Sequence, residues 1–350
     1  MTKETQHYMA LSLQLNCPTI NGLSVEDSRN SMMKTIEKIG FHVNGSKALI
    51  GRDTKLVVLP EYFMTGYPLG ESIQEWTEKA AIEIDGAEYN ALSSIAQEND
   101  VFLSGNAYEK DEHFPGLYFQ TSFIISPSGE VILRYRRLIS LYAPTPHDVW
   151  DKYLEVYGEE SIFPVVDTEI GKLACCASEE ILYPEICRAH TLRGAEIILH
   201  SSSEVASNDL TPKDVAKRAR AIENLVYLVS CNSGGIIGSP IPTNSVDGMS
   251  KIIDYRGTVL ASSSIGETMA SNAEIDLPAL RRYRNRPGMS NMLSRQRLEL
   301  FQGTYNSISI YPPNSLIDKK TGDFFIPERT HFSNTQKNVL DNLQKFLKSE

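Results

Sequence analysis

The sequence predicts an α/β fold in which two β-sheets pack face to face and carry helices on their outer faces, a four-layer αββα sandwich. Three observations lead to this prediction. Short apolar runs alternate with helical patterns, the strands come in pairs, and the helices between them come in pairs as well. With 350 residues, of which 41% are hydrophobic, the chain is long enough for one large domain of this kind and an extension.

The first half of the chain gives the elements of one sheet and its helices. Ser24 and Asp27 are spaced as a capping box and open a helix whose apolar residues recur at helical intervals. The apolar run 56–59, closed by Pro60, is typical of a strand buried on both faces. The other expected elements are strands at 8–15 and 101–104, a helix at 87–96, and a hairpin formed by 122–125 and 131–135.

The second half repeats this alternation. Thr211 is placed as the N-cap, and Pro212 as the first residue, of a helix that extends to Asn224. We also expect strands at 172–177, 197–200 and 226–230, a helix at 184–192 that ends before Gly194, and a hairpin turn at 254–257. These elements define a domain over residues 1–275.

Residues 276–350 form a C-terminal extension of different character. Its sequence becomes basic and then rich in aromatic residues and proline, and a polar helix is expected near 334–347. The extension is either an arm that packs on a second subunit or a loose tail. The aromatic residues favour the arm, and these are Phe301, Tyr305, Tyr311, Phe324 and Phe325.

Charge and composition exclude several classes of partner. Lys and Arg number 34 against 44 Asp and Glu, which gives a net charge of −10, and we therefore expect no nucleic-acid or membrane partner. The first fifteen residues do not have the pattern of a signal peptide, and no stretch reaches the about 18 apolar residues of a membrane span. A cytoplasmic location is expected. Five cysteines without C-x-x-C or zinc-finger spacing predict reduced, buried thiols and no metal.

Four segments place polar residues at the ends of predicted strands. LVVLPEYFMTGYP (56–68) sets Glu61 just after a buried strand, and RYRRL (134–138) sets three arginines at another strand end. GKLACCASEEILYPEICR (171–188) passes from a strand through Ser178 into a helix, and RARAIENLVYLVSCNSGG (218–235) is a helix followed by a buried strand. Because strand ends at one rim of an α/β sheet form ligand sites, we expect these residues to meet.

These blocks, in this order over residues 8–275, resemble the nitrilase superfamily, the carbon–nitrogen hydrolases. The resemblance implies the αββα sandwich, no cofactor, and homodimers or larger homo-oligomers. It also implies a triad of Glu, Lys and Cys that attacks a small amide-like or nitrile carbon. On that pattern Glu61 is the base, Arg137 stands where the Lys is expected, and Ser178 stands where the Cys is expected. A second family Glu is absent, and Asp151 or Asp148 replaces it.

The replacements change what the site can do chemically. A serine hydroxyl is far less acidic than a thiol and needs a positioned base at the moment of attack. Arginine does not lose its proton, so Arg137 is expected to clamp a carboxylate or an oxyanion. The backbone N–H of Glu179 is a candidate oxyanion donor, and His200 and His147 are candidate residues of the substrate pocket. Cys176, on the same face of the strand as Ser178, is a weaker candidate nucleophile.

Each candidate also has a plainer interpretation. Glu61 could cap a loop, Ser178 could be an ordinary turn serine, and Arg134 and Arg136 are expected to be solvated or structural. Glu179, Glu180 and Glu185 are more often salt-bridge formers than catalysts. Two functions remain open: hydrolysis or acyl transfer at a small amide-like carbon, or a pseudoenzyme that binds a ligand or regulates. An engineered Cys-to-Ser exchange would not account for Arg137.

Overall fold

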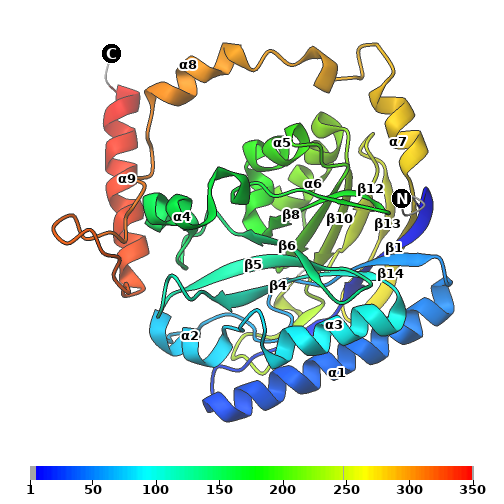
Figure 1. Cartoon of the computed structure of the whole chain (residues 1–350), viewed down its shortest axis with the longest axis horizontal. Helices are drawn as coiled ribbons and strands as arrows, with labels where there is room; N and C mark the ends of the chain where they lie inside the picture. Colours follow the sequence, from blue (N-terminus) through cyan, green and yellow to red (C-terminus); the bar gives the residue numbers. More distant parts are fainter. Residues whose placement is uncertain (1–4, 247, 349–350) are drawn as a thin grey trace.

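Two six-stranded sheets packed face to face form the centre of the molecule in the computed structural model, which describes residues 5–246 and 248–348 (Figure 1). The first sheet has the order β14-β1-β3-β4-β5-β6: β14 (Thr268–Asp276), β1 (His7–Gln14), β3 (Thr54–Val58), β4 (Phe102–Lys110), β5 (Tyr118–Ile125) and β6 (Val131–Arg136). The second has the order β13-β12-β10-β9-β8-β7: β13 (Val259–Ser262), β12 (Lys251–Ile253), β10 (Tyr227–Asn232), β9 (Ile197–Ser202), β8 (Gly171–Ala177) and β7 (Val166–Thr168). Two short strands, β2 (Asn16–Pro18) and β11 (Gly235–Ile237), pair separately.

Helices cover the outer face of each sheet, as the sequence predicts. The first sheet carries α1 (Val25–Ile50), α2 (Ile73–Ala80) and α3 (Ala87–Asn99), and the second carries α5 (Pro184–Leu192) and α6 (Pro212–Asn224) (Figure 1). The remaining helices are α4 (Trp150–Tyr157), α7 (Leu277–Arg284), α8 (Glu299–Ser307) and α9 (Thr330–Lys348). The four-layer αββα sandwich is therefore confirmed.

Both predicted helix caps are present. The Ser24 hydroxyl accepts a hydrogen bond from Asp27 N at 3.1 Å, and the Thr211 hydroxyl accepts one from Asp214 N at 3.1 Å. Each bond satisfies a backbone N–H that the first helical turn leaves without a partner. Pro212 is the first residue of α6, where its missing N–H costs nothing.

The two sheets touch through small and aromatic side chains. Ser104 on β4 lies 4.0 Å from the Cys175 sulfur on β8, and the Tyr8 hydroxyl donates to Ile170 O at 2.9 Å. All five cysteines are buried and unpaired, as predicted.

Several strands differ from the sequence prediction: β5 begins at Tyr118 and not at residue 122, and the short strands β2, β7 and β11 were not predicted. β4 extends to Lys110, well beyond the expected 101–104, because it pairs with β5 along its whole length. β14 was not predicted, and it closes the edge of the first sheet by pairing antiparallel with β1. Its exposed and buried residues alternate, with polar and small side chains such as Ser271 and Asn272, so its apolar signal is weak.

The C-terminal segment arches over the second sheet and returns to the first (Figure 1). Leu280 on α7, Leu316, and Phe332 on α9 are fully or almost fully buried in the domain core. Phe301 and Tyr305 on α8 remain 51% and 62% exposed. Part of the extension thus packs on its own domain, and its role as an oligomerisation arm stays a prediction. No helix in the described ranges is long and apolar enough to cross a membrane.

Candidate active site

Strand ends from both sheets meet around one cavity of about 620 Å³. β3, β8 and β9 reach this rim with their carboxyl ends, and β6 ends at the same edge of the first sheet. Five tyrosines form much of its wall, namely Tyr62, Tyr67, Tyr108, Tyr118 and Tyr142. The polar lining includes Gln120, Arg137, Ser178, Glu179, Ser203 and Lys213.

Glu61 lies fully buried directly behind this lining, three residues beyond the end of β3. Its Oε1 accepts hydrogen bonds from Gln120 Nε2 at 2.6 Å and from Arg137 at 3.4 Å. Its Oε2 accepts from Ser203 N at 2.9 Å. Three donors converge on one buried carboxylate, which is the arrangement that a charged carboxylate requires away from water.

Arg137 directly follows β6 and its guanidinium spans the cavity wall. Its Nε donates to Ile139 O at 2.8 Å, and one terminal nitrogen donates to Gln120 Oε1 at 2.6 Å and to Glu61. The other terminal nitrogen forms an ion pair with Glu179. Burial opposes the charged form, but the carboxylates of Glu179 and Glu61 and the Tyr62 phenol hold the pKa of Arg137 above its ordinary value. Arg137 therefore stays cationic.

Ser178 stands at the turn between β8 and α5, with its side chain at the cavity wall. The strand ends at Ala177, and Ser178 adopts φ +51°, in the left-handed region. The predicted strand end at residue 177 is confirmed, and Ser178, which lies beyond it, does not share a strand face with the weaker candidate Cys176. A non-glycine residue held in this region stores backbone strain, which is common at functional sites.

Tyr62, the residue after Glu61, also has a positive φ, of 59°. Two residues with left-handed backbone thus line one cavity. Ser178 is buried and Tyr62 is half-buried, and packing of this kind keeps a strained backbone in place.

His200 on β9 supports Ser178 from behind the cavity. Burial, with the Lys217 ammonium as a further cause, lowers the pKa of His200 well below its ordinary value, so the ring is neutral. Its Nε2 lies 2.8 Å from Ser178 O, which can only accept, so Nε2 carries the proton. Its Nδ1 then accepts from the Ser230 hydroxyl at 2.9 Å. His200 holds the backbone of Ser178 and does not line the cavity.

Glu180 joins the two segments that carry Arg137 and Ser178. One oxygen accepts from the backbone N–H groups of Leu138 and Ile139 at 2.7 and 3.1 Å. The other accepts from the Tyr135 hydroxyl at 2.8 Å and from Ala177 N at 3.3 Å. Burial raises the pKa of Glu180 to about 7, against the lowering effect of Arg137 and these hydrogen bonds. Glu180 was expected to form a salt bridge, and instead it binds backbone groups and a phenol.

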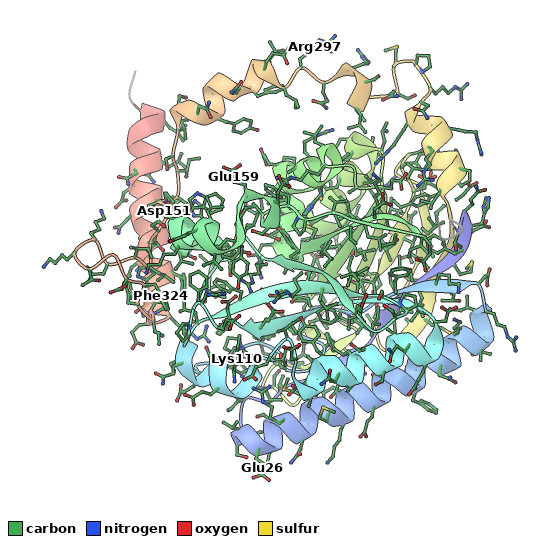
Figure 2. The ribbon with its side chains drawn as sticks, in the orientation of Figure 1. Glu26, Lys110, Asp151, Glu159, Arg297 and Phe324 are labelled. Atoms are coloured by element: carbon green, nitrogen blue, oxygen red, sulfur yellow. The ribbon has the colours of Figure 1, made fainter. Side chains whose placement is uncertain are left out.

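The structure does not bring Asp151, Asp148 or His147 to the cavity. Asp151 is exposed at the start of α4, at the periphery of the molecule, and its N–H donates to Asn314 Oδ1 at 3.0 Å (Figure 2). Asp148 caps the preceding turn through Thr145 and accepts from the Ser315 hydroxyl at 2.6 Å. The Asp148 carboxylate and the Asp151 backbone N–H thus both bind the C-terminal segment.

His147 and Cys176 also lie elsewhere. The His147 ring packs near Trp150 and Tyr311, with centroid distances of 5.8 and 6.1 Å. Cys176 is fully buried, and this burial, with the neighbouring Cys187, raises the pKa of its thiol well above the ordinary value. A thiol that resists ionisation is a poor nucleophile.

Three residues of the site were missed by the sequence analysis. Gln120 on β5 bridges Glu61 and Arg137, Lys213 reaches the cavity from α6, and Arg329 reaches it from just before α9. Arg329 donates to Tyr142 O at 3.1 Å and to the Tyr118 hydroxyl at 3.5 Å. None of the three lies in a motif, so only the folded chain identifies them.

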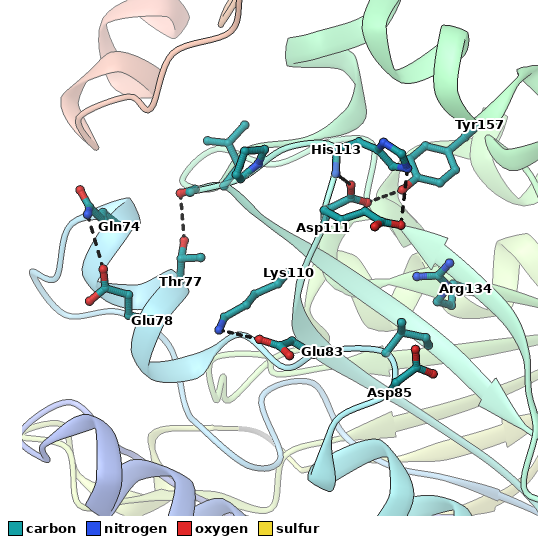
Figure 3. Close-up of a pocket in the computed structure, with 15 residues that line it drawn as sticks. Gln74, Thr77, Glu78, Glu83, Asp85, Lys110, Asp111, His113, Arg134 and Tyr157 are labelled. Carbon is teal, nitrogen blue, oxygen red and sulfur yellow. Dashed lines mark hydrogen bonds and ion pairs between the residues drawn. The ribbon is translucent and has the colours of Figure 1, made fainter.

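A second cavity, of about 670 Å³, lies apart from the predicted site residues, between α2, the end of β4 and the turn at 111–117 (Figure 3). Its side chains largely satisfy one another: Lys110 pairs with Glu83 at 3.1 Å, and the Tyr157 hydroxyl donates to Asp111 at 2.5 Å. Within residues 5–246 and 248–348, no three His, Cys, Asp or Glu side chains are grouped so that they could hold a metal ion.

Known proteins share this fold and sequence pattern. Residues 12–285 match the family model of the carbon–nitrogen hydrolases. This match covers more than half of the chain, and the chain therefore belongs to the carbon–nitrogen hydrolase family. Nitrilase homolog 2 of Dictyostelium discoideum is 25% identical over 231 residues, which are 66% of this chain and 68% of that protein. A formamidase of Bacillus cereus (strain Q1) is 27% identical over 243 residues, 68% of this chain and 66% of that protein.

Solved structures agree on the architecture. A carbon–nitrogen hydrolase from Helicobacter pylori G27 superposes with a TM-score of 0.63 at 22% identity, over 85% of this chain and 98% of that chain. An amidase from Nesterenkonia sp. superposes with a TM-score of 0.60 at 18% identity, over 87% of this chain and 98% of that one. At these identities the comparison shows the shared fold.

Proposed function

We propose that this chain cleaves the carbon–nitrogen bond of a small amide-like substrate, with Ser178 Oγ as the nucleophile. The main observation that supports this proposal is the position of Ser178. Its hydroxyl lines the tyrosine-walled cavity from a strained turn at the end of β8, and the lining also includes Arg137 and Gln120, which bind the buried Glu61. A hydroxyl held in this way at the wall of a concave site can attack a bound carbonyl carbon.

The reaction proceeds in two steps. Ser178 Oγ bonds to the amide carbon, the carbon–nitrogen bond breaks, and ammonia or an amine leaves an ester on Ser178. Water or a second amine then releases the acyl group, which gives hydrolysis or acyl transfer. Arg137 and the backbone N–H of Glu179 are the proposed donors to the oxyanion, because Arg137 keeps its charge throughout.

The family relation supports assigning Ser178 and Arg137 to the nucleophile and lysine positions of the triad, with Glu61 at the third. Relatives named as a formamidase and as an amidase support an amide as the substrate class. The cavity volume of about 620 Å³ suits a small molecule.

A second candidate function is ligand binding without turnover. The observation that favours it is the ion pair between Arg137 and Glu179 at the cavity wall, which occupies the guanidinium that an oxyanion would need. On this view the cavity binds a polar ligand that displaces Glu179, and the protein regulates or senses.

We also propose a homo-oligomer, supported by the exposed aromatic side chains of α8, Phe301 and Tyr305. Size-exclusion chromatography with light scattering tests this directly. A monomer of 39.1 kDa at all concentrations would contradict it.

The test of the proposed activity is ammonia release from a panel of primary amides, nitriles and N-carbamoyl acids. Wild-type protein, Ser178→Ala and Ser178→Cys are compared. We expect turnover by the wild type that the Ala variant loses. Turnover by the Ala variant would contradict the assignment of Ser178 as the nucleophile. If the wild type releases no ammonia but binds a ligand tightly, the second candidate function is favoured.

A further inference from the structure

The Ser178 hydroxyl has a polar neighbour that neither the motif nor the triad supplies. Among the hydrogen bonds of the described residues, the one that reaches Ser178 Oγ comes from Lys213 Nζ, at 3.5 Å. The same Nζ lies 3.4 Å from Ser202 Oγ at the end of β9. Lys213 is thus held between two serines, and its amine faces the cavity.

The two expected triad partners are poorly suited to take the Ser178 proton. Both Glu61 oxygens are already engaged by Gln120, Arg137 and Ser203, and no hydrogen bond between Glu61 and Ser178 is present in the described ranges. Arg137 cannot act as a base, because a guanidinium does not lose its proton in proteins. A serine nucleophile therefore needs another group within reach of its hydroxyl.

The position of Lys213 follows from the way α6 begins. Thr211 caps the helix, Pro212 is its first residue, and Lys213 is the second, so the side chain starts at the rim where β8 and β9 end. Within the described ranges, no carboxylate lies within ion-pair distance of Lys213. The lysines nearby differ in this respect: Lys217 is 3.9 Å from Glu204, and Lys251 pairs with Asp214. The Lys213 amine is therefore not tied up in an ion pair.

We propose that Lys213 is the base that takes the proton of Ser178, so that these two residues form the nucleophile–base pair of the site. The inference rests on the proposed function, since it requires Ser178 to attack. Serine–lysine pairs perform this chemistry on other folds. The distance of 3.5 Å is long for a hydrogen bond, as is common for catalytic contacts without substrate.

Lys213 accepts and returns one proton in each step of the reaction, so the protons balance. In its neutral form the amine accepts the Ser178 proton while Oγ bonds to the amide carbon. The ammonium then gives this proton to the leaving nitrogen as the carbon–nitrogen bond breaks. In the second step Lys213 takes a proton from the attacking water and returns it to Ser178 Oγ as the ester bond breaks. No metal, oxidant or further reactant is needed.

Two readouts test this pair, and neither requires the natural substrate to be known. A fluorophosphonate probe reports whether Ser178 is nucleophilic: Oγ bonds to phosphorus, fluoride leaves, and intact mass with peptide mapping locates the adduct. Ammonia release from the best amide of the panel reports turnover. Three variants of Lys213 are compared. Lys213→Arg keeps the charge but cannot act as a base, and Lys213→Gln removes the charge. Lys213→Cys is measured before and after aminoethylation, which restores an amine at nearly the same distance from the backbone. Lys34, on the first helix, provides the matched control Lys34→Gln.

We expect Lys213→Arg and Lys213→Gln to lose turnover and labelling rate by about 10²–10⁴-fold, the usual contribution of a general base. Aminoethylated Lys213→Cys should recover a large part of both, and Lys34→Gln should match the wild type. Full activity of Lys213→Arg in a labelled, active protein would overturn the base role and leave the proposed function standing. No recovery on aminoethylation would also overturn it. Failure of the wild type to label and to turn over would overturn the proposed function and this pair with it.

Discussion

Removing either partner of the buried ion pair between Arg137 and Glu61 should destabilise the protein strongly. Removing both charges together should lower the free energy of unfolding by less than the sum of the two single changes. The Arg137 side chain is 5% exposed and the Glu61 side chain 0%, with 3.4 Å between their charged atoms. At an effective dielectric constant of about 20, this distance corresponds to an attraction of about 5 kcal/mol, most of which offsets the cost of desolvating the two charges.

We therefore expect Arg137→Met to lower the free energy of unfolding by about 3–5 kcal/mol, because it leaves the Glu61 carboxylate buried without its counter-charge. Glu61→Gln should cost somewhat less, because Arg137 keeps its ion pair with Glu179. In the double variant neither Glu61 nor Arg137 leaves the other as an unpaired buried charge. Its loss in free energy of unfolding should therefore be about 2 kcal/mol smaller than the sum of the two single losses.

The assay is urea denaturation of the wild type, the two single variants and the double variant. Unfolding is monitored by tryptophan fluorescence and by circular dichroism. Arg134→Met is the matched control: its side chain is 35% exposed, and its partner Glu109 keeps a second contact with Arg136. We expect this control to cost at most about 1 kcal/mol. Additive costs of Arg137→Met and Glu61→Gln within about 0.5 kcal/mol would refute the coupling.

Three further predictions concern the residues that position the site. Thr211→Ala should lower the free energy of unfolding by about 1 kcal/mol, measured by urea denaturation, because Asp214 N loses its cap. Burial raises the pKa of Glu180 from its ordinary value of 4.5 to about 7, so the folded state binds this proton more tightly than the unfolded state does. Its contribution to stability is therefore present below pH 4.5 and is lost as the pH rises to 7, by up to about 3 kcal/mol, and Glu180→Gln should flatten that slope in a pH series of unfolding curves. His200→Ala should lower kcat with a smaller change in KM, since His200 holds the backbone of Ser178 and does not line the cavity.

The sequence predicted the layers of the fold and the two strand ends that carry Glu61 and Ser178. Ser178 directly follows an apolar strand and Glu61 comes three residues after one, so each predicted strand also places the residue beyond its end. The apolar period and the capping residues of a helix are local features, so the start of α6 at Pro212, capped by Thr211, could also be predicted.

The rest of the site depends on contacts between distant segments. Asp151 was chosen because it follows Arg137 in the chain, but the intervening loop turns away and packs against Asn314. Lys213 is a charged residue in a polar first turn, a pattern typical of a solvated helix end, and only the meeting of α6 with β8 brings it to Ser178. Arg329 reaches the cavity because the C-terminal segment returns to the domain.

The most direct test of the central claim is to trap the acyl group on Ser178. Wild-type protein is mixed with the best amide of the panel, quenched in acid within the first turnover, and analysed by intact mass and peptide mapping, with Ser178→Ala in parallel. The account predicts an adduct of one acyl group on the peptide that contains Ser178, absent from the Ala variant. An adduct on any other residue, or turnover that Ser178→Ala retains, would contradict it.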